Sequence, residues 1–465
     1  MGRGFASFLA LSLLAGLALR LIPFSLPSFT DPDHYYHLRI SESIAQAGAF
    51  PGYDALSFQG RPHTYYPLFH CIIATAAILT GLPAFYAYAA VSLLCALAAI
   101  AATYALAKRI FGAPVALYAS AFAALLPAVL IRGAGLARPD SLSFLLLPLL
   151  AMALLLAGNR QSLAAAALLG FILPLLHPFT ALFACALVAA KLAADFSLGR
   201  SRLPHAAWFF IPALASFSYY LRFPLGQLVL AKTFTTSSEM QAFNFEFIAV
   251  AIGAAWLFLV FAALKPASDS GRRMLWLWLA GATALSLLAS RNIIYAAAPA
   301  CLLAGAGLNH ILSRGIARPL VLCLLGAGLL LGSVLYLSDA GPQYSKPAVY
   351  GARWLGVNSA AAVVSYWDKG HLLTYYGARV FIDGYFEFAP DLDARHSLSM
   401  RLFHAPYGAA LNELYAQGVR YAFVDGKMAA DMENYPGNFR EYAEQSLRVL
   451  RVYDSGLAQA YSFSG

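Results

Sequence analysis

The stretch TDPDHYYHLR, residues 30–39, follows closely on the apolar run Phe5–Phe24, which is long enough to cross a bilayer. Its two carboxylates, two imidazoles and one guanidinium are costly beside a membrane unless they face water or coordinate a ligand. One interpretation is a polar loop, and the other is a catalytic metal-binding loop at the membrane surface. The spacing of Asp31 and Asp33 favours a hard divalent cation, Mg²⁺ or Mn²⁺, because carboxylate oxygens suit these ions.

The composition excludes a soluble globular protein, since 60% of the 465 residues are hydrophobic and 11% are charged. We predict a polytopic α-helical protein of the cell membrane with about eleven spans of roughly 20 apolar residues each. The net charge of +9 is attributed to cytoplasmic loops rather than to nucleic-acid binding. All five cysteines lie in apolar runs without metal-ligand spacing, which argues against disulfides and against a zinc site.

The predicted spans alternate between two sides of the membrane. They are Phe5–Phe24, Phe85–Ala107, Pro114–Ile131, Ser141–Leu156, Ser162–Leu176, Pro178–Ala194, Ala206–Tyr220, Phe247–Leu264, Met274–Leu288, Ile293–Ile311 and Leu320–Leu337. The short run Leu68–Leu79 is interpreted as an interfacial helix of the first external loop, residues 25–84. Every second hinge is basic, as at Lys108-Arg109, and the positive-inside rule places these hinges in the cytoplasm. The remaining hinges and the tail then face outward.

The tail, residues 339–465, is more polar than the spans, residues 1–338, and predicts a small extracytoplasmic α/β domain after the transmembrane domain. Its strands are expected at Ala361–Trp367, Val380–Ile382, Arg420–Val424 and Leu447–Tyr453, with a helix at Gly408–Ala416. The sequence has no Gly-rich nucleotide loop, so phosphate transfer from ATP is not indicated.

The outward segments carry further candidate ligands. Arg132 and Arg138 run against the positive-inside bias, which indicates a functional or lipid-binding role. Asp140 heads a predicted helix, where an N-cap is the simpler alternative. Glu239 is a third carboxylate, on a long outer loop. Arg291 lies between two apolar runs, where it can bind a phosphate or extend its charge toward the interface.

A last group of candidates ends a predicted strand of the tail. Trp367 and Asp368 can form a pocket, since the ring gives contact area and the carboxylate accepts a hydrogen bond from a hydroxyl. Packing of the Trp in the core of the tail is the alternative.

Together these features resemble the catalytic subunit of oligosaccharyltransferase, a GT-C glycosyltransferase, especially its single-subunit archaeal and bacterial forms. Asp33–Arg39 resembles the family's Asp-Pro-aromatic-aromatic-x-x-Arg, Thr236–Glu239 its Thr-x-x-Glu, and Tyr366–Gly370 its Trp-Trp-Asp-x-Gly. The similarity continues through Gly377–Glu387 and Gly418–Asp425. The chain departs from the family pattern at Tyr366, which replaces the first Trp, and at Leu142, which replaces the second metal-binding residue after Asp140.

The resemblance implies transfer of a glycan from a polyprenyl or dolichyl (di)phosphate carrier to the asparagine of Asn-x-Ser/Thr in a protein outside the membrane. It assigns metal binding and catalysis to Asp33, Asp140 and Glu239, with Asp31 nearby, phosphate binding to Arg291 with Arg132 or Arg138, and hydroxyl recognition to Tyr366, Trp367 and Asp368. One alternative is a related GT-C transferase that glycosylates a lipid or a Ser/Thr hydroxyl. A non-enzymatic alternative is a transporter or scaffold for a lipid-linked glycan.

Overall fold

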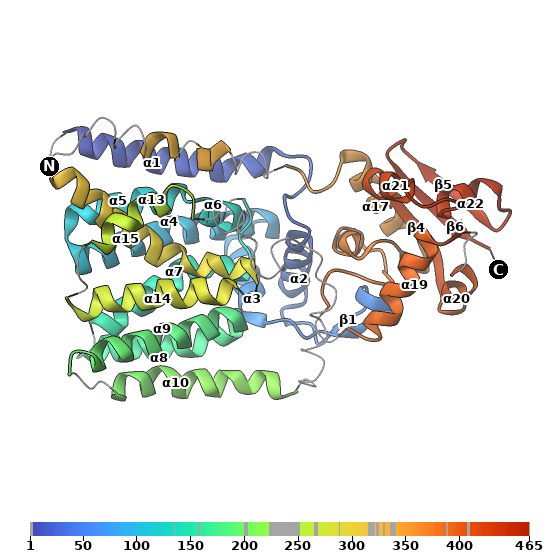
Figure 1. Ribbon diagram of the computed structural model, residues 1–465. Coiled ribbons are helices and arrows are strands. Elements are labelled where there is room, and N and C mark those ends of the chain that lie inside the picture. Colours follow the sequence, from blue (N-terminus) through green and yellow to red (C-terminus); the bar gives the residue numbers. More distant parts are fainter. Residues whose placement is uncertain are drawn as a thin grey trace.

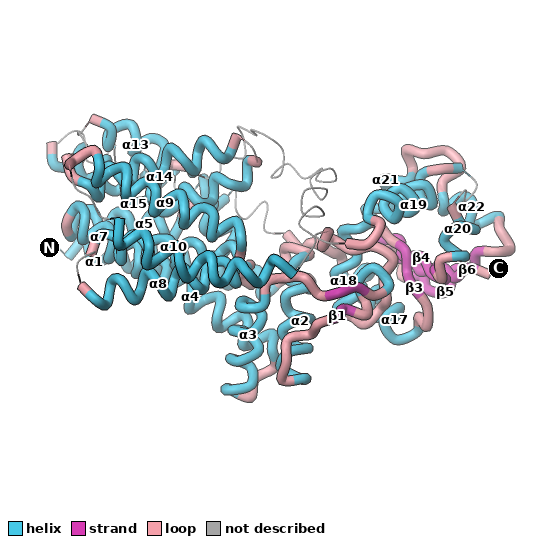
Figure 2. Tube along the Cα trace, turned by 90° about the horizontal axis from the view of Figure 1, so that it is seen from below, coloured by secondary structure: helices cyan, strands magenta, loops and turns pink. Residues whose placement is uncertain are grey.

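The chain forms a helical bundle that continues into a smaller α/β unit at the C-terminal end, as the ribbon in Figure 1 shows. In Figure 2 the strands gather in and beside that unit, while the bundle consists of helices joined by loops. The computed structural model describes residues 3–133, 135–156, 159–199, 203–222, 252–264, 268–287, 289–314, 321, 325–328, 331–334, 341–386, 389–406 and 410–464.

The bundle is built from apolar helices packed around one core. Its helices are α1 Arg3–Leu21, α4 Ala84–Phe111, α5 Ala113–Leu125, α6 Pro127–Gly133, α7 Ser143–Leu155, α8 Arg160–Leu176, α9 Pro178–Phe196, α10 Leu203–Phe217, α13 Ala255–Ala263, α14 Ser270–Ser286 and α15 Ala297–Ser313. Alanine and leucine dominate the buried positions between them, which lets the helices approach closely. Among the described residues, three helices are long and apolar enough to cross a membrane, at Ala84–Phe111, Pro178–Phe196 and Asn292–Ser313. The predicted helical class is confirmed.

Two predicted spans differ from the structure or lie largely beyond what it describes. Pro114–Ile131 is two helices rather than one, because Pro127 forces the preceding Leu126 into an extended conformation and begins α6. Most of Leu320–Leu337 lies outside the described residues.

The stretch at residues 30–39 is largely helical and buried rather than a polar loop. Asp33 begins helix α2 (Asp33–Ala47), which ends at Gly48 in a left-handed conformation. His34 and His37 are both buried on this helix. The run interpreted as an interfacial helix is α3 (Pro67–Thr80), and α2 packs against it.

The C-terminal unit is a four-stranded sheet with helices. Its strands are β3 Ala362–Val364, β4 Val419–Asp425, β5 Val449–Asp454 and β6 Ala458–Phe463, in the order β3-β4-β6-β5. β3 is parallel to β4, and the other pairs are antiparallel. Its helices are α17 Lys346–Asn358, α18 Gly370–Tyr375, α19 Leu392–His404, α20 Leu411–Ala416, α21 Gly426–Met432 and α22 Phe439–Gln445.

Most of the predicted strands are present, with two corrections. The strand expected at Ala361–Trp367 stops at Val364, and its last residue begins the short helix η7 (Trp367–Lys369). Val380–Ile382 is not a strand, since within it only Val380 forms a bridge, with Val363.

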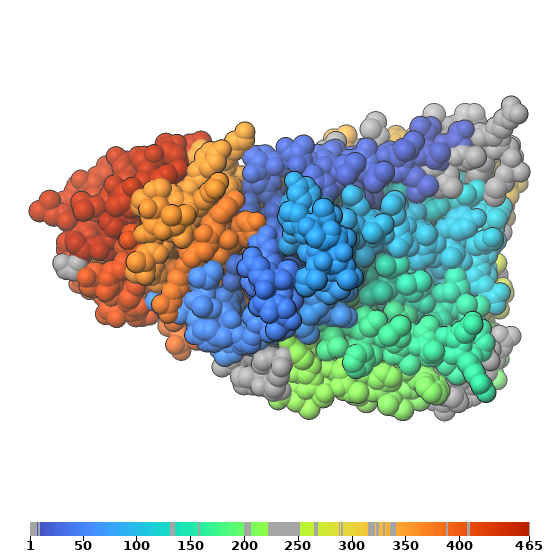
Figure 3. All heavy atoms as spheres, turned by 180° about the vertical axis from the view of Figure 1, so that it is seen from behind, coloured from blue at the N-terminus to red at the C-terminus, as the bar shows by residue number. Residues whose placement is uncertain are grey.

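The segment between α1 and α4, predicted to be the first external loop, lies between the bundle and the C-terminal unit, as the space-filling view in Figure 3 shows. Its segment 56–61 joins the tail through backbone hydrogen bonds: Val380 N–H donates to Leu56 O, and Gln59 N–H donates to Val380 O, each at 2.8 Å. Phe58 is only 1% exposed and adopts a positive φ of 50°. Because a non-glycine residue pays for that conformation with strain, the packing around it must hold it there. This segment fixes the tail over the start of α2.

Candidate functional site

Three carboxylates from two separate loops gather around one guanidinium. Arg138 Nη1 lies 2.6 Å from Asp31 Oδ2 and 3.0 Å from Asp33 Oδ2, and its Nε lies 3.9 Å from Asp140 Oδ1. The Arg138 side chain is 12% exposed, whereas Asp33 keeps 41% of its side chain exposed. The structure therefore brings four of the predicted site residues into one cluster, which we call the carboxylate centre.

The loop that carries Arg138 is held by the bundle and by a local cap. Ala137 N–H donates to Ser92 Oγ of α4 at 2.8 Å, and Arg138 N–H donates to Ser141 Oγ at 3.1 Å. Pro139 begins the short helix η3 (Pro139–Leu142) immediately afterward. The alternative of Asp140 as the cap of the next helix is wrong, because Leu142 occupies the N-cap of α7 and no side chain caps it.

The charge of the carboxylate centre is negative in excess, because three carboxylates face one guanidinium. Burial raises the pKa of the Asp33 carboxyl, and the neighbouring Asp31 raises it further, while Arg138 opposes both. His34, one residue along, adds no positive charge at neutral pH, since burial lowers its pKa to about 4. His37 is likewise held neutral by burial, and its Nδ1 lies 3.0 Å from His70 Nε2.

The donor chemistry of the carboxylate centre fits a hard divalent cation. Asp140 Oδ1 is buried and has no hydrogen-bond partner among the described residues, so an oxygen ligand is available there. Arg138 engages the Oδ2 atoms of Asp31 and Asp33, which leaves Asp33 Oδ1 free of it. The described residues alone do not arrange three metal-ligating side chains for a metal ion. The predicted fourth ligand, Glu239, lies outside the described residues.

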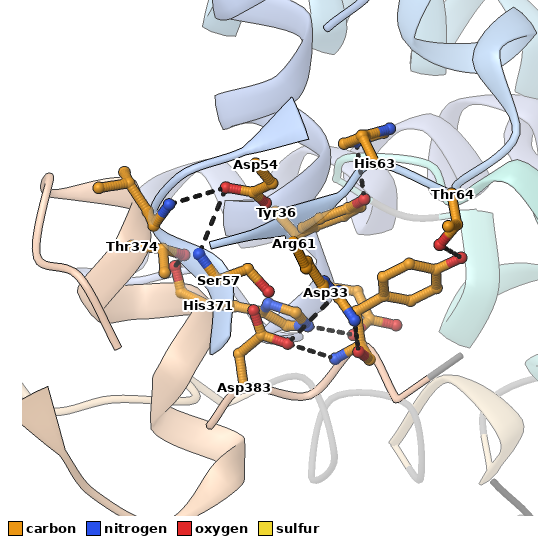
Figure 4. Close-up of polar contacts among 12 residues, drawn as sticks. Asp33, Tyr36, Asp54, Ser57, Arg61, His63, Thr64, His371, Thr374 and Asp383 are labelled. Carbon is orange, nitrogen blue, oxygen red and sulfur yellow. Dashed lines mark hydrogen bonds and ion pairs between the residues drawn. The ribbon is translucent and has the colours of Figure 1, made fainter. Parts of the chain in front are cut away.

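The tail contributes His371 to the same centre, a residue that the sequence did not single out. His371 Nε2 lies 3.8 Å from Asp33 Oδ1, and Figure 4 shows the two side chains facing each other. The ring fits because residue 384 is glycine: a Cβ at that position would lie 2.9 Å from His371 Nε2. His371 falls inside the segment that contains the Trp-Asp pair, but no local pattern indicates its contact with a residue of α2.

Trp367 and Asp368 lie four and three residues before His371. Trp367 is half-buried and packs edge-on against Phe386, with ring centroids 5.2 Å apart. Asp368 Oδ2 accepts a hydrogen bond from Lys369 Nζ at 2.9 Å, while Asp368 Oδ1 has no hydrogen-bond partner among the described residues. Lys369 is nearly fully buried and also lies 3.1 Å from Asp425 Oδ2. One oxygen of Asp368 is thus fixed, and the other is buried without a hydrogen-bond partner among the described residues.

The hydroxyl of Tyr366, which stands in place of the family's first Trp, is used within the tail. It donates to Asp431 Oδ2 at 2.5 Å and also contacts His404 Nε2. His404 in turn stacks on Tyr435, with ring centroids 4.0 Å apart. The structure therefore engages Tyr366 with α19 and α21 and does not bring its hydroxyl to the carboxylate centre.

The two remaining predicted residues lie on described backbone. Arg132 belongs to α6, and Arg291 belongs to the short helix η6 (Ser290–Ala296). The elements α6 and η6 contact each other, so these two arginines come from neighbouring segments.

No protein-family model and no curated protein matches the sequence. Among solved structures, the chain is similar to the apo oligosaccharyltransferase of Archaeoglobus fulgidus, with a TM-score of 0.70 and 14% identity over 99% of this chain and 74% of that one. The same archaeal protein, AglB, with an inhibitory peptide and a dolichol-phosphate gives a TM-score of 0.69 and 13% identity, with the same coverage. It has also been solved with Zn and sulfate.

ArnT from Cupriavidus metallidurans bound to undecaprenyl phosphate gives a TM-score of 0.62 and 15% identity over 98% of both chains. Similarity at such low identity shows a common fold. The chain therefore has the fold shared by archaeal oligosaccharyltransferase and ArnT, which confirms the resemblance to the oligosaccharyltransferase catalytic subunit at the level of the fold.

Proposed function

We propose that the chain is a membrane glycosyltransferase that moves a glycan from a polyprenyl (di)phosphate carrier to the asparagine of an Asn-x-Ser/Thr sequon. The observation that carries the proposal is the closeness of two sets of residues. Asp368 has one buried oxygen without a hydrogen-bond partner among the described residues, which would accept a hydroxyl hydrogen bond, and His371 on the same short segment contacts Asp33 of the carboxylate centre. Acceptor recognition and the reacting group would therefore share one site.

In the proposed reaction the carboxylate centre binds and orients the acceptor amide. Asp33 and Asp140, with Asp31 and Glu239, would hold Mg²⁺ or Mn²⁺, which supplies Lewis-acid polarisation and orientation when bound. Asp33 and Asp140 would also accept hydrogen bonds from the amide N–H₂ and hold its nitrogen toward the sugar carbon. Holding two reactants in a productive geometry removes much of the entropic barrier. Arg138 would hold the carboxylates together and ionised, since its guanidinium is within 3.0 Å of two of them.

The acceptor hydroxyl would bind to Asp368. Lys369 forms ion pairs with both Asp368 and Asp425. It thereby fixes the Asp368 carboxylate, so that Asp368 Oδ1 keeps one orientation. Trp367 would supply contact area beside it. Because a free carboxylate oxygen accepts hydrogen bonds only, this pocket favours Ser and Thr over Ala at the third sequon position.

The donor would be held on the outer face by Arg291, with Arg132 on the adjacent helix. A guanidinium binds phosphate oxygens through paired N–H donors and stabilises the charge of the leaving polyprenyl phosphate. Two proteins of this fold support the donor class, since AglB has been solved with a dolichol-phosphate and ArnT with undecaprenyl phosphate.

A second candidate is a related transferase whose acceptor is a lipid or a Ser/Thr hydroxyl. The observation that favours it is that the match with ArnT covers 98% of both chains, whereas the match with the archaeal oligosaccharyltransferase leaves about a quarter of that protein uncovered. This candidate would use the carboxylate centre and Arg291 but has no need of the Asp368 pocket. A transporter or scaffold would need neither an intact carboxylate centre nor an intact Asp368 pocket.

The proposed function is tested with purified protein, a polyprenyl-linked glycan and four peptides that contain Asn-x-Thr, Asn-x-Ser, Asn-x-Ala or Gln-x-Thr. We expect transfer to the Thr and Ser peptides, little to the Ala peptide and none to the Gln peptide. Asp368→Ala should lower transfer to the Thr peptide by about 1–3 kcal/mol, the range for a lost hydrogen bond to a charged group. Asp454→Ala, which removes a carboxylate at the far edge of the sheet, is the matched control and should have no effect.

Transfer to a lipid or to a hydroxyl peptide, with no use of Asn-x-Thr, would favour the second candidate. An equal effect of Asp368→Ala on every acceptor would also count against sequon recognition. Absence of any glycan transfer under these conditions would favour the non-enzymatic alternative.

A further inference from the structure

His371 connects the segment Trp367–His371, which we call the acceptor segment, to the carboxylate centre. Its side chain is 3% exposed, and its ring lies 5.2 Å from the ring of Tyr36, which belongs to α2. Its backbone is anchored in α18, where Thr374 Oγ1 donates to His371 O at 3.2 Å. The ring is thus fixed from two sides, by helix α2 of the first loop and by the tail.

The two oxygens of Asp33 face different donors. Asp33 Oδ2 accepts a hydrogen bond from Arg138 Nη1 at 3.0 Å, and Asp33 Oδ1 lies 3.8 Å from His371 Nε2. A distance of 3.8 Å is longer than a direct hydrogen bond, but it is short enough for an electrostatic contact or for a bridge through one water. Rotation of the carboxylate about its bond to the chain would break at least one of the two contacts.

We propose that His371 is a positioning residue that sets the rotation of the Asp33 carboxylate through a hydrogen on Nε2. This inference rests on the proposed function and deepens it. His371 follows Asp368 by only three residues. An acceptor bound at Asp368 and the Asp33 carboxylate that acts on its amide are therefore held in a fixed relative position. The role belongs to the nitrogen at the ε position rather than to the ring.

Three substitutions separate this role from simple packing. His371→Gln places an amide N–H near the position of Nε2, His371→Asn places it near Nδ1, and His371→Phe keeps a ring without a nitrogen. Nδ1 has no hydrogen-bond partner among the described residues, so the Asn variant is the matched control. Loss of a group that orients a reacting residue costs roughly 10- to 100-fold in activity.

We expect the Gln variant to keep most of the wild-type kcat, and the Asn and Phe variants to lose roughly 10- to 100-fold, with the peptide KM within about twofold in all three. The melting temperature of the Phe variant should match that of the wild type, because its ring still packs on Tyr36. A packing role predicts the reverse order, with Phe active and Gln impaired. That order, or a rise in peptide KM with kcat unchanged, would overturn the proposal.

A second readout does not depend on glycan transfer. If the wild-type protein transfers no glycan, the proposed function fails, and the contact is then judged by unfolding of Asp33→Asn, His371→Phe and the double variant in detergent. Non-additive effects would support the contact between the two side chains, since residues in contact couple and distant residues do not. Additive effects would refute it.

Discussion

Removing the guanidinium of Arg138 should expose the repulsion that the carboxylate centre contains. In Arg138→Gln, the side chain at this position is similar in size but carries no charge, so three carboxylates remain close together without their counter-ion among the described residues. Asp31 and Asp33, at 2.6 and 3.0 Å from Arg138, lose the largest favourable contacts. Asp140, at 3.9 Å, loses a weaker one.

The magnitude follows from the exposure of the four side chains. Breaking a fully buried ion pair costs about 3–5 kcal/mol, and breaking an exposed one costs about 0–1 kcal/mol. Arg138 is nearly buried, but Asp33 is 41% exposed, so water screens part of the repulsion. We therefore expect a loss of about 2–3 kcal/mol in the free energy of unfolding.

The assay is chemical unfolding in detergent micelles, followed by circular dichroism. Arg401→Gln is the matched control, because Arg401 forms an exposed pair with Glu413 at 2.7 Å and should contribute less than about 1 kcal/mol. Asp31→Asn should destabilise the wild type but partly rescue Arg138→Gln, since it then removes a repelling charge. Equal stability of Arg138→Gln and wild type, or additive effects of the two substitutions, would refute the reasoning.

Three further predictions concern metal, acidity and topology. Transfer should stop in excess chelator and return with Mg²⁺ or Mn²⁺, and Asp33→Ala should lose most transfer while remaining folded; full activity in chelator contradicts the metal role. Burial, followed by His63, lowers the pKa of His70 to about 3, so the unfolded state takes up a proton first as the pH falls. The contribution of His70 should therefore lower the stability of the wild type by about 1.4 kcal/mol between pH 7.5 and 5.5, so His70→Phe should lose about that much less than the wild type, as urea titrations at both pH values would reveal. In a variant without native cysteines, a cysteine at exposed Val357 should label from outside intact cells, and one at exposed Phe196 only after permeabilisation; the opposite pattern would invert the proposed orientation.

Much of the fold and part of the site follow from the sequence because they depend on local pattern. Apolar runs of helical length became helices, and the β-prone run before Asp425 became β4. The gathering of Asp33 with Asp140 also follows, because alternation of the spans puts both loops on one side of the bundle. Arg138, which contacts both carboxylates, could be named as a candidate because a basic residue on the predicted outward side runs against the positive-inside bias.

The missed features depend on contacts between distant segments. Strand β6 (Ala458–Phe463) has a mixed polar and apolar sequence, and it is a strand because β4 and β5 pair with both of its edges. The burial of His34 and His37 requires distant segments to pack on α2, since His34 lies against Tyr88 of α4 and His37 against His70 of α3, which no local pattern encodes. Val380 could not be recognised as an isolated bridge, because its backbone pairs with the first loop as well as with β3.

The same long-range contacts tie the tail to the segment that carries Asp31 and Asp33. Ser28 Oγ donates to Tyr344 O at 2.8 Å, and Tyr344 N–H donates to Ser28 Oγ at 3.0 Å, just before the chain reaches Asp31. The hydroxyl of Tyr344 in turn donates to the backbone oxygen of Asp368. Tyr344 and His371 thus link the carboxylate centre to the acceptor segment along two separate routes. Because both routes pass through buried side chains, a shift of the tail would move the proposed hydroxyl pocket and the carboxylate of Asp33 together, so we expect that exchanging the tail alone would disturb both.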